Sequence, residues 1–99
     1  MGRKRSVFTL RKRAFLNPPS TGDTTYILVE VESSDNGHYQ WGTNMVTLAD
    51  CDRSIRLEFF LGIKRERRRS LAKLNLLIDM LTRFRDALTK ESHLIDKAK

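Results

Sequence analysis

The sequence predicts an α+β protein in which a three- to four-stranded antiparallel meander sheet is followed by one long C-terminal helix packed on one sheet face. Three observations predict this fold. Residues 24–33 and 54–62 alternate between apolar and polar side chains, as strands with two unlike faces do. An Asn-Gly pair at 36–37 suits a tight hairpin turn, and residues 70–90 carry a leucine-rich stripe of helical period. We therefore expect residues 24–90 to form a single β-β-β-α core domain.

The predicted strands are separated by turn signals. The Asn-Gly turn leads into a return strand over residues 38–49, whose apolar alternation changes phase after Gly42. A one-residue phase change at a glycine predicts a β-bulge. A second turn over residues 49–53 then leads into the strand at 54–62.

The first 16 residues are basic and allow two interpretations. Residues 7–12 alternate weakly, with Phe8 and Arg11 on opposite sides of the chain. This pattern fits either an edge strand or an extended N-terminal arm. The next segment, residues 17–23, contains two prolines and a glycine and predicts a loop.

The predicted helix is amphipathic. Its apolar side chains recur at intervals of three and four residues, at Leu71, Leu74, Leu77, Ile78, Leu81, Phe84 and Leu88. Leu76 and Met80 widen the apolar arc, which favours a helix covered on two sides. A second copy in a homodimer, meeting this one through the helix or a sheet edge, would cover it. The alternative is the N-terminal segment of the same chain.

The polar side of this helix offers two ion pairs. Asp79–Arg83 and Asp86–Lys90 have the spacing and order that favour pairing along a helix. Residues 91–99 are expected to form a frayed tail.

Composition restricts the class of protein. The 99 residues carry a net charge of +7, with +6 in residues 1–22, −5 in 23–63 and +6 in 64–99. Two basic segments flanking an acidic one favour a polyanionic partner such as nucleic acid. The single cysteine allows no internal disulfide, and no apolar run approaches a membrane span or a secretory signal. We expect no membrane partner and a cytoplasmic, nucleoid or nuclear location, not secretion.

Two basic segments and several aromatic side chains are candidates for binding nucleic acid. Basic residues crowd the junction before the helix, where the macrodipole opposes positive charge, so their position favours a functional use. Sheet aromatics, Tyr26 among them, can stack on bases, although most such rings belong to a core. The candidate binding residues are Lys64, Arg65, Arg67, Arg68, Arg69, Arg3, Lys4, Arg5, Arg11, Lys12, Arg13, Arg56, Phe60, Trp41 and Tyr39.

The sequence contains no complete catalytic or metal-binding pattern. His38 and His93 are far apart, and Asp50-Cys51-Asp52 supplies too few ligands for a Zn²⁺ or Ca²⁺ site. Cys51 has no evident base partner, and an aspartate in a turn usually bonds its own backbone. We therefore expect a non-enzymatic protein without cofactor or metal.

The predicted order of elements, strands and then one C-terminal helix across residues 6–90, resembles that of the single-stranded nucleic-acid binders of the PUR-repeat and Whirly kind. The resemblance implies a twisted sheet that binds DNA or RNA in a dimer or larger assembly. Our leading hypothesis is a small basic nucleic-acid-binding protein that contacts the phosphate backbone and stacks bases on aromatic side chains. The alternatives are a protein-interaction module, such as a small inhibitor or assembly subunit from a phage or mobile element, and a ribonucleoprotein component.

Overall fold

A computed structural model describes residues 7–17, 22, 24–34 and 42–98. The chain divides into two compact units, residues 1–67 and 68–99, and each is described by itself. The first unit contains the sheet and the start of the helix, and the second contains the rest of the helix.

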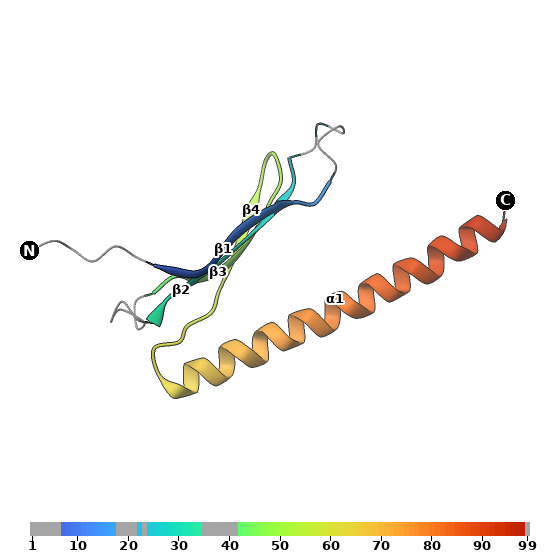
Figure 1. Cartoon of the computed structure of the whole chain (residues 1–99). Helices are drawn as coiled ribbons and strands as arrows, with labels where there is room; N and C mark the ends of the chain where they lie inside the picture. Colours follow the sequence, from blue (N-terminus) through green and yellow to red (C-terminus); the bar gives the residue numbers. More distant parts are fainter. Residues whose placement is uncertain (1–6, 18–21, 23, 35–41, 99) are drawn as a thin grey trace, which may run out of the picture. The chain divides into compact units, whose positions relative to one another are not determined.

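The sheet has four antiparallel strands in the order in which they occur along the chain (Figure 1). They are β1 (Phe8–Phe15), β2 (Tyr26–Glu32), β3 (Asn44–Ala49) and β4 (Ser54–Glu58). The predicted meander is confirmed, and the N-terminal segment contributes its fourth strand. Because β1 lies at an edge of the sheet, its basic side chains are exposed.

An irregularity near the start of β1 changes which side chains share a face. The pairing register with β2 shifts between Phe8 and Leu10, so one residue is inserted there. Such an insertion reverses the alternation of the preceding residues. Phe8 therefore shares a face with Arg11, whereas the sequence alternation placed the two on opposite sides.

The strands are shorter than the sequence predicts. β3 begins at Asn44, and the Asn-Gly turn with residues 38–41 lies outside the described residues. β4 ends at Glu58 instead of residue 62, since β3 begins at Asn44. The Phe59 amide makes the last bond between the two, to the Asn44 carbonyl 2.9 Å away. The ladder between β3 and β4 has no further rung beyond that pair in the described structure.

Asp50 closes the turn between β3 and β4. Its carboxylate accepts hydrogen bonds from the amides of Asp52, at 2.9 Å, and Arg53, at 2.7 Å. The Asp50 amide donates to the Arg53 carbonyl at 2.8 Å. This carboxylate serves the backbone, as the sequence predicts for an aspartate in a turn.

The strand registers give the sheet two unlike faces. One, here called the basic–aromatic face, carries Phe8, Arg11, Arg13, Phe15, Tyr26, Leu28, Glu30, Glu32, Met45, Thr47, Ala49, Ser54, Arg56 and Glu58. The other, here called the apolar face, carries Leu10, Lys12, Ala14, Ile27, Val29, Val31, Asn44, Val46, Leu48, Ile55 and Leu57. Among the described residues only one apolar side chain, that of Ala49, is buried. Within the described residues, the sheet and the helix, each taken by itself, therefore bury little apolar surface.

The helix α1 runs from Lys64 to Ala98 (Figure 1). The basic residues 64–69 are thus its first two turns, and Ser70 lies inside the helix. The tail expected to fray is helical as far as Ala98. The physical reason is that no glycine or proline interrupts residues 64–98, while Leu94 and Ile95 continue the apolar stripe. Packing of the helix on a sheet face stays a prediction.

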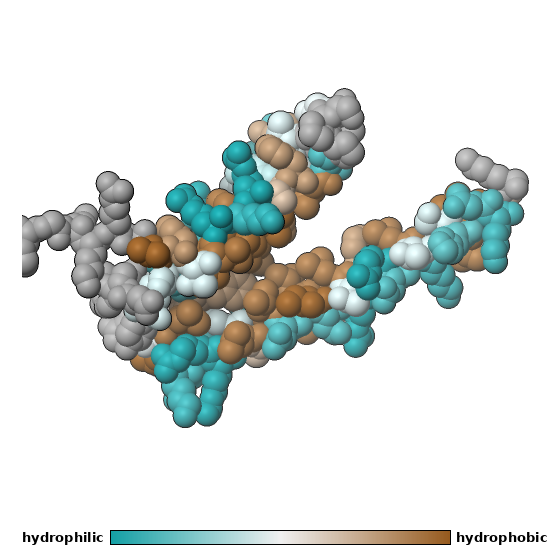
Figure 2. Space-filling model, viewed as in Figure 1, coloured by the Kyte–Doolittle hydropathy of each residue, from teal (hydrophilic) through white to brown (hydrophobic). Residues whose placement is uncertain are grey.

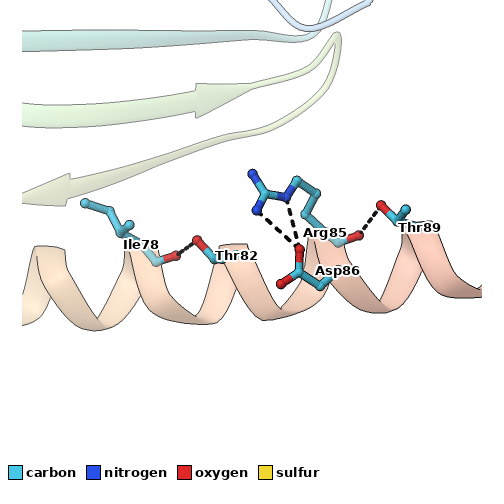
Figure 3. Close-up of polar contacts among 5 residues, drawn as sticks. All are labelled: Ile78, Thr82, Arg85, Asp86 and Thr89. Atoms are coloured by element: carbon cyan, nitrogen blue, oxygen red, sulfur yellow. Dashed lines mark hydrogen bonds and ion pairs between the residues drawn. The ribbon is translucent and has the colours of Figure 1, made fainter.

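Polar contacts follow one side of α1. Arg83 pairs with Asp79 at 3.2 Å, as predicted, but Asp86 pairs with the adjacent Arg85 at 3.2 Å instead of Lys90. The hydroxyls of Thr82 and Thr89 donate to carbonyls one turn earlier, at 2.8 and 2.9 Å (Figure 3). These ion pairs are exposed, so each adds only about 0.3–0.5 kcal/mol.

Candidate nucleic-acid interface

The start of α1 is a dense exposed basic cluster (Figure 2). All five of its cationic side chains lie in the first two helical turns and are exposed to solvent: Lys64, Arg65, Arg67, Arg68 and Arg69. Lys64 and Arg68, and likewise Arg65 and Arg69, are four residues apart, so like charges are neighbours on the helix surface. The positive end of the helix dipole adds to this repulsion by about 0.3–1 kcal/mol per charge. An anion bound here would relieve both.

Arg67 differs from its neighbours because it has a structural contact. Its guanidinium Nη1 donates to the Leu61 carbonyl at 2.9 Å, and its amide donates to the Ile63 carbonyl at 2.9 Å. It therefore fastens the first helical turn to the segment that follows β4. Of the five cations, Arg67 is the one whose position the fold itself explains.

A second basic site lies on the basic–aromatic face. The Arg13 guanidinium carbon is 5.3 Å from the centre of the Phe15 ring and 5.5 Å from that of Tyr26. The two rings meet edge to face, with centres 6.4 Å apart. Phe15 is 53% exposed, so its ring is open to a further stacking partner. An arginine beside an exposed ring can contact a phosphate while a base stacks on the ring.

Arg11 extends this site along β1. Its guanidinium carbon lies 5.0 Å from the centre of the Phe8 ring, and its Nε is 3.3 Å from a carboxylate oxygen of Glu30. The inserted residue near Thr9 makes the first contact geometrically accessible, because it turns Phe8 toward the same face. Part of the charge of Arg11 is thus neutralised within the sheet.

The other predicted binding residues are dispersed. Arg56 of β4 lies on the basic–aromatic face opposite Thr47, whereas Lys12 lies on the apolar face. Phe60 is 54% exposed but follows the end of β4, so strand alternation does not place it beside Arg56. The remaining candidates, Arg3, Lys4, Arg5, Tyr39 and Trp41, lie outside the described residues.

Phe60 lines a recess that the sequence did not predict. The recess has a volume of about 310 Å³ and is lined by Gly42, Thr43, Asn44, Met45, Glu58, Phe59 and Phe60. The buried amide oxygen of Asn44 has no hydrogen-bond partner.

Two members of the basic–aromatic face, Phe8 and Phe15, were missed by sequence reasoning. Phe15 could have been found, because Arg11, Arg13 and Phe15 are spaced by two and must share a face of any strand. Phe8 could not, because its position depends on the inserted residue.

The described residues offer little for catalysis. No group of three or more histidine, cysteine, aspartate or glutamate side chains within residues 7–17, 22, 24–34 and 42–98 could hold a metal ion. The Cys51 thiol is exposed and lies 3.2 Å from the Thr24 hydroxyl, which is no general base.

No known protein family, curated protein or solved structure matches this chain. In the part of the chain that the structure describes, no helix is both long and apolar enough to cross a membrane.

Proposed function

We propose that this chain is a non-enzymatic nucleic-acid-binding protein that acts as a homodimer. The observation that carries the proposal is the exposed basic cluster at the start of α1, where five cations stand against the helix dipole and against each other. Apart from Arg67, which bonds the Leu61 carbonyl, these cations make no contact among the described residues that explains their placement, and this favours an anionic ligand. Phosphate groups are ligands that match this charge.

The proposed binding uses two kinds of contact, one to phosphates and one to bases. Lys64, Arg65, Arg68 and Arg69 neutralise phosphates, which provides affinity without sequence preference. The basic–aromatic face supplies stacking: a base lies on the Phe15 ring while Arg13 approaches the phosphate that follows it. Bases are open to stacking only in single strands, so the proposal specifies single-stranded DNA or RNA as the preferred ligand.

The test of the phosphate contacts is a salt titration. Fluorescence anisotropy with labelled single- and double-stranded oligonucleotides measures affinity for the wild type and for an Arg68→Ala/Arg69→Ala variant. Losing two phosphate contacts lowers the slope of log K against log salt concentration by about 1.4 for single strands. The matched control is Arg83→Ala/Lys97→Ala, which removes two charges elsewhere on the same helix. No detectable binding at low salt to any oligonucleotide, or equal effects of both variants, would contradict the proposal.

The stacking contact has its own test. Phe15→Leu keeps an apolar side chain on β1 but removes the ring. We expect affinity for single strands to fall by about 1–3 kcal/mol, that is roughly 5- to 150-fold, while affinity for duplex changes little. Leu10→Ala on the apolar face is the control. Equal losses for single and double strands would show that Phe15 does not stack on bases.

A protein-interaction module is the second candidate function. It is favoured by the large apolar side chains that α1 exposes, including Leu76 at 62% and Met80 at 56%. A pull-down from the cell of origin that survives nuclease and high salt would select this function, and loss of all partners under those conditions would select nucleic acid.

A further inference from the structure

We propose that α1 is the dimerisation element and that two copies of the chain pair through it as an antiparallel coiled coil. The inference deepens the dimer of the proposed function by naming its interface and geometry. It requires no nucleic acid, so it can be tested on the protein alone.

The spacing along α1 is that of a heptad repeat. Positions a and d, taken from Leu74 onward, are occupied by Leu74, Leu77, Leu81, Phe84, Leu88, Glu91, Ile95 and Ala98. Seven of these eight residues are apolar, and Glu91 is the one interruption. A strict seven-residue apolar repeat drifts around a straight helix, so it stays in contact only when two helices wind around each other. A helix that covers a flat sheet has no need of this period.

Four of these seam residues are exposed, whereas Leu74 and Leu77 are half-buried. Leu81 is 56% exposed, Phe84 62%, Leu88 55% and Ile95 60%. The opposite side of α1 carries Asp79, Thr82, Arg83, Asp86 and Thr89, whose polar contacts are made within the helix. Figure 3 shows the contacts of Thr82, Asp86 and Thr89. The helix therefore has one apolar side to bury and one polar side that needs no partner.

Length indicates that the chain's own sheet cannot cover the whole seam. The 35 residues of α1 extend over about 52 Å, at 1.5 Å per residue. The longest strand, β1, has 8 residues and spans about 27 Å. Whatever the placement of the sheet, roughly half of the helix extends beyond a strand's length. A second helix of the same length matches the seam from end to end.

Charge selects the antiparallel orientation. Residues 64–73 contain six basic side chains and Glu66, a net charge of +5, whereas residues 79–98 contain four basic and four acidic side chains and sum to zero. A parallel pair would bring the two +5 segments side by side. In the antiparallel register that joins Leu81 to the partner's Phe84, each +5 segment lies beside residues 92–99 of the partner, which contain Asp96, Lys97 and Lys99 and carry a net charge of only +1. The same arrangement sets the two helix dipoles in opposition, which is favourable.

The repeat also gives a register. Layers in antiparallel coiled coils join an a position to a d position, so Leu81 packs against the partner's Phe84 and Leu77 packs against the partner's Leu88. The two-fold axis then passes between residues 82 and 83. The basic clusters lie at opposite ends of the coiled coil, so one dimer presents two separated phosphate-binding sites.

The experiment measures mass and orientation separately. Sedimentation equilibrium without nucleic acid compares the wild type with Leu81→Glu/Phe84→Glu and with the control Thr82→Glu/Thr89→Glu, which adds the same charge on the polar side. We expect a dimer for the wild type and control and a monomer for the seam variant. A wild-type monomer, or a seam variant that stays dimeric, overturns the proposal.

Orientation is measured with a spin label at residue 97 in a Cys51→Ser/Lys97→Cys chain. In the antiparallel register residue 97 lies level with the partner's residue 68, so the two labels are about 44 Å apart along the axis. A parallel pair would hold them within about 10–20 Å, near the spacing between helix axes. A short distance overturns the antiparallel arrangement. If the protein is a monomer but binds oligonucleotides with the expected salt dependence, the interface fails while the nucleic-acid function stands.

Discussion

Glu30 is the one acidic side chain that the described part of the chain buries, with 8% of its surface exposed. Its partner is Arg11, whose side chain is 61% exposed and lies on the edge strand. A buried carboxylate needs a cation or hydrogen-bond donors nearby, because burial removes its hydration. Arg11 therefore has a structural role besides any contact with a ligand. At the scale of single residues, the basic strand contains both a structural cation and free ones.

The first prediction compares these two kinds of cation. Arg11→Ala leaves Glu30 without its ion pair, and we expect the free energy of unfolding to fall by about 1–2 kcal/mol, less than for a fully buried pair because Arg11 is exposed. Lys12→Ala, on the other face of the same strand, should change it by less than about 0.5 kcal/mol. Urea denaturation measures both. Equal effects would mean that the Arg11–Glu30 pair contributes nothing to stability.

At the scale of elements, the first two turns of α1 carry charges that lower helix stability, and the rest of the helix carries residues that raise it. Its first two turns hold five cations, and the rest has helix-forming residues, an apolar repeat and Lys97 in the last turn, where positive charge is favourable. Arg67 connects the first turns of α1 to the segment after β4, because its guanidinium donates to the Leu61 carbonyl. Neighbouring residues therefore differ in their role: Arg67 stabilises the fold, whereas Arg68 lowers helix stability and is proposed to bind a ligand.

The second prediction separates these roles. Arg68→Ala removes a charge that opposes the helix dipole, so we expect the free energy of unfolding to rise by about 0.3–1 kcal/mol while affinity for nucleic acid falls. Arg67→Ala should instead lower the free energy of unfolding by about 0.5–1.5 kcal/mol, because a hydrogen bond to the backbone is lost. Thermal unfolding and anisotropy on the same samples give both quantities. A destabilising Arg68→Ala would show that this side chain is held for structure.

At the scale of the whole molecule, the exposed apolar surface is the dominant fact. The described residues bury one apolar side chain, which is too little to offset the conformational entropy lost by a chain of this length without further packing. In the proposed dimer, folding and association are linked, and the second copy completes the hydrophobic core. On the basic–aromatic face Glu30, Thr47 and Ala49 are buried, whereas Phe15 and the basic cluster at the start of α1 are exposed.

The third prediction follows from this linkage. Because the dimer gains stability by mass action, its thermal midpoint should rise by about 3–5 °C for each tenfold increase in protein concentration. Calorimetry over two decades of concentration measures the trend. The control variant Thr82→Glu/Thr89→Glu should show the same trend, and a midpoint independent of concentration would contradict linked folding and association.

Local sequence determined the elements and their order. Alternation over residues 24–33 and 54–62 specified two strands, and the stripe from Leu71 to Leu88 specified the helix, because each pattern follows from the period of one element. The exposed basic start of α1 was also predictable, since a run of cations cannot be buried. These features depend on neighbours in the chain alone.

Tertiary structure decided which side chains meet. The register shift near Thr9 turned Phe8 toward Arg11, and the β1–β2 pairing brought Arg13 between Phe15 and Tyr26, which are 11 residues apart in sequence. Strand lengths were likewise set by the partner strand, because β4 can extend only as far as β3 offers hydrogen bonds. The sequence alone determined a basic α+β protein with an amphipathic helix. The pairing of distant residues, which no local pattern encodes, decided that its arginines and aromatic rings form one face.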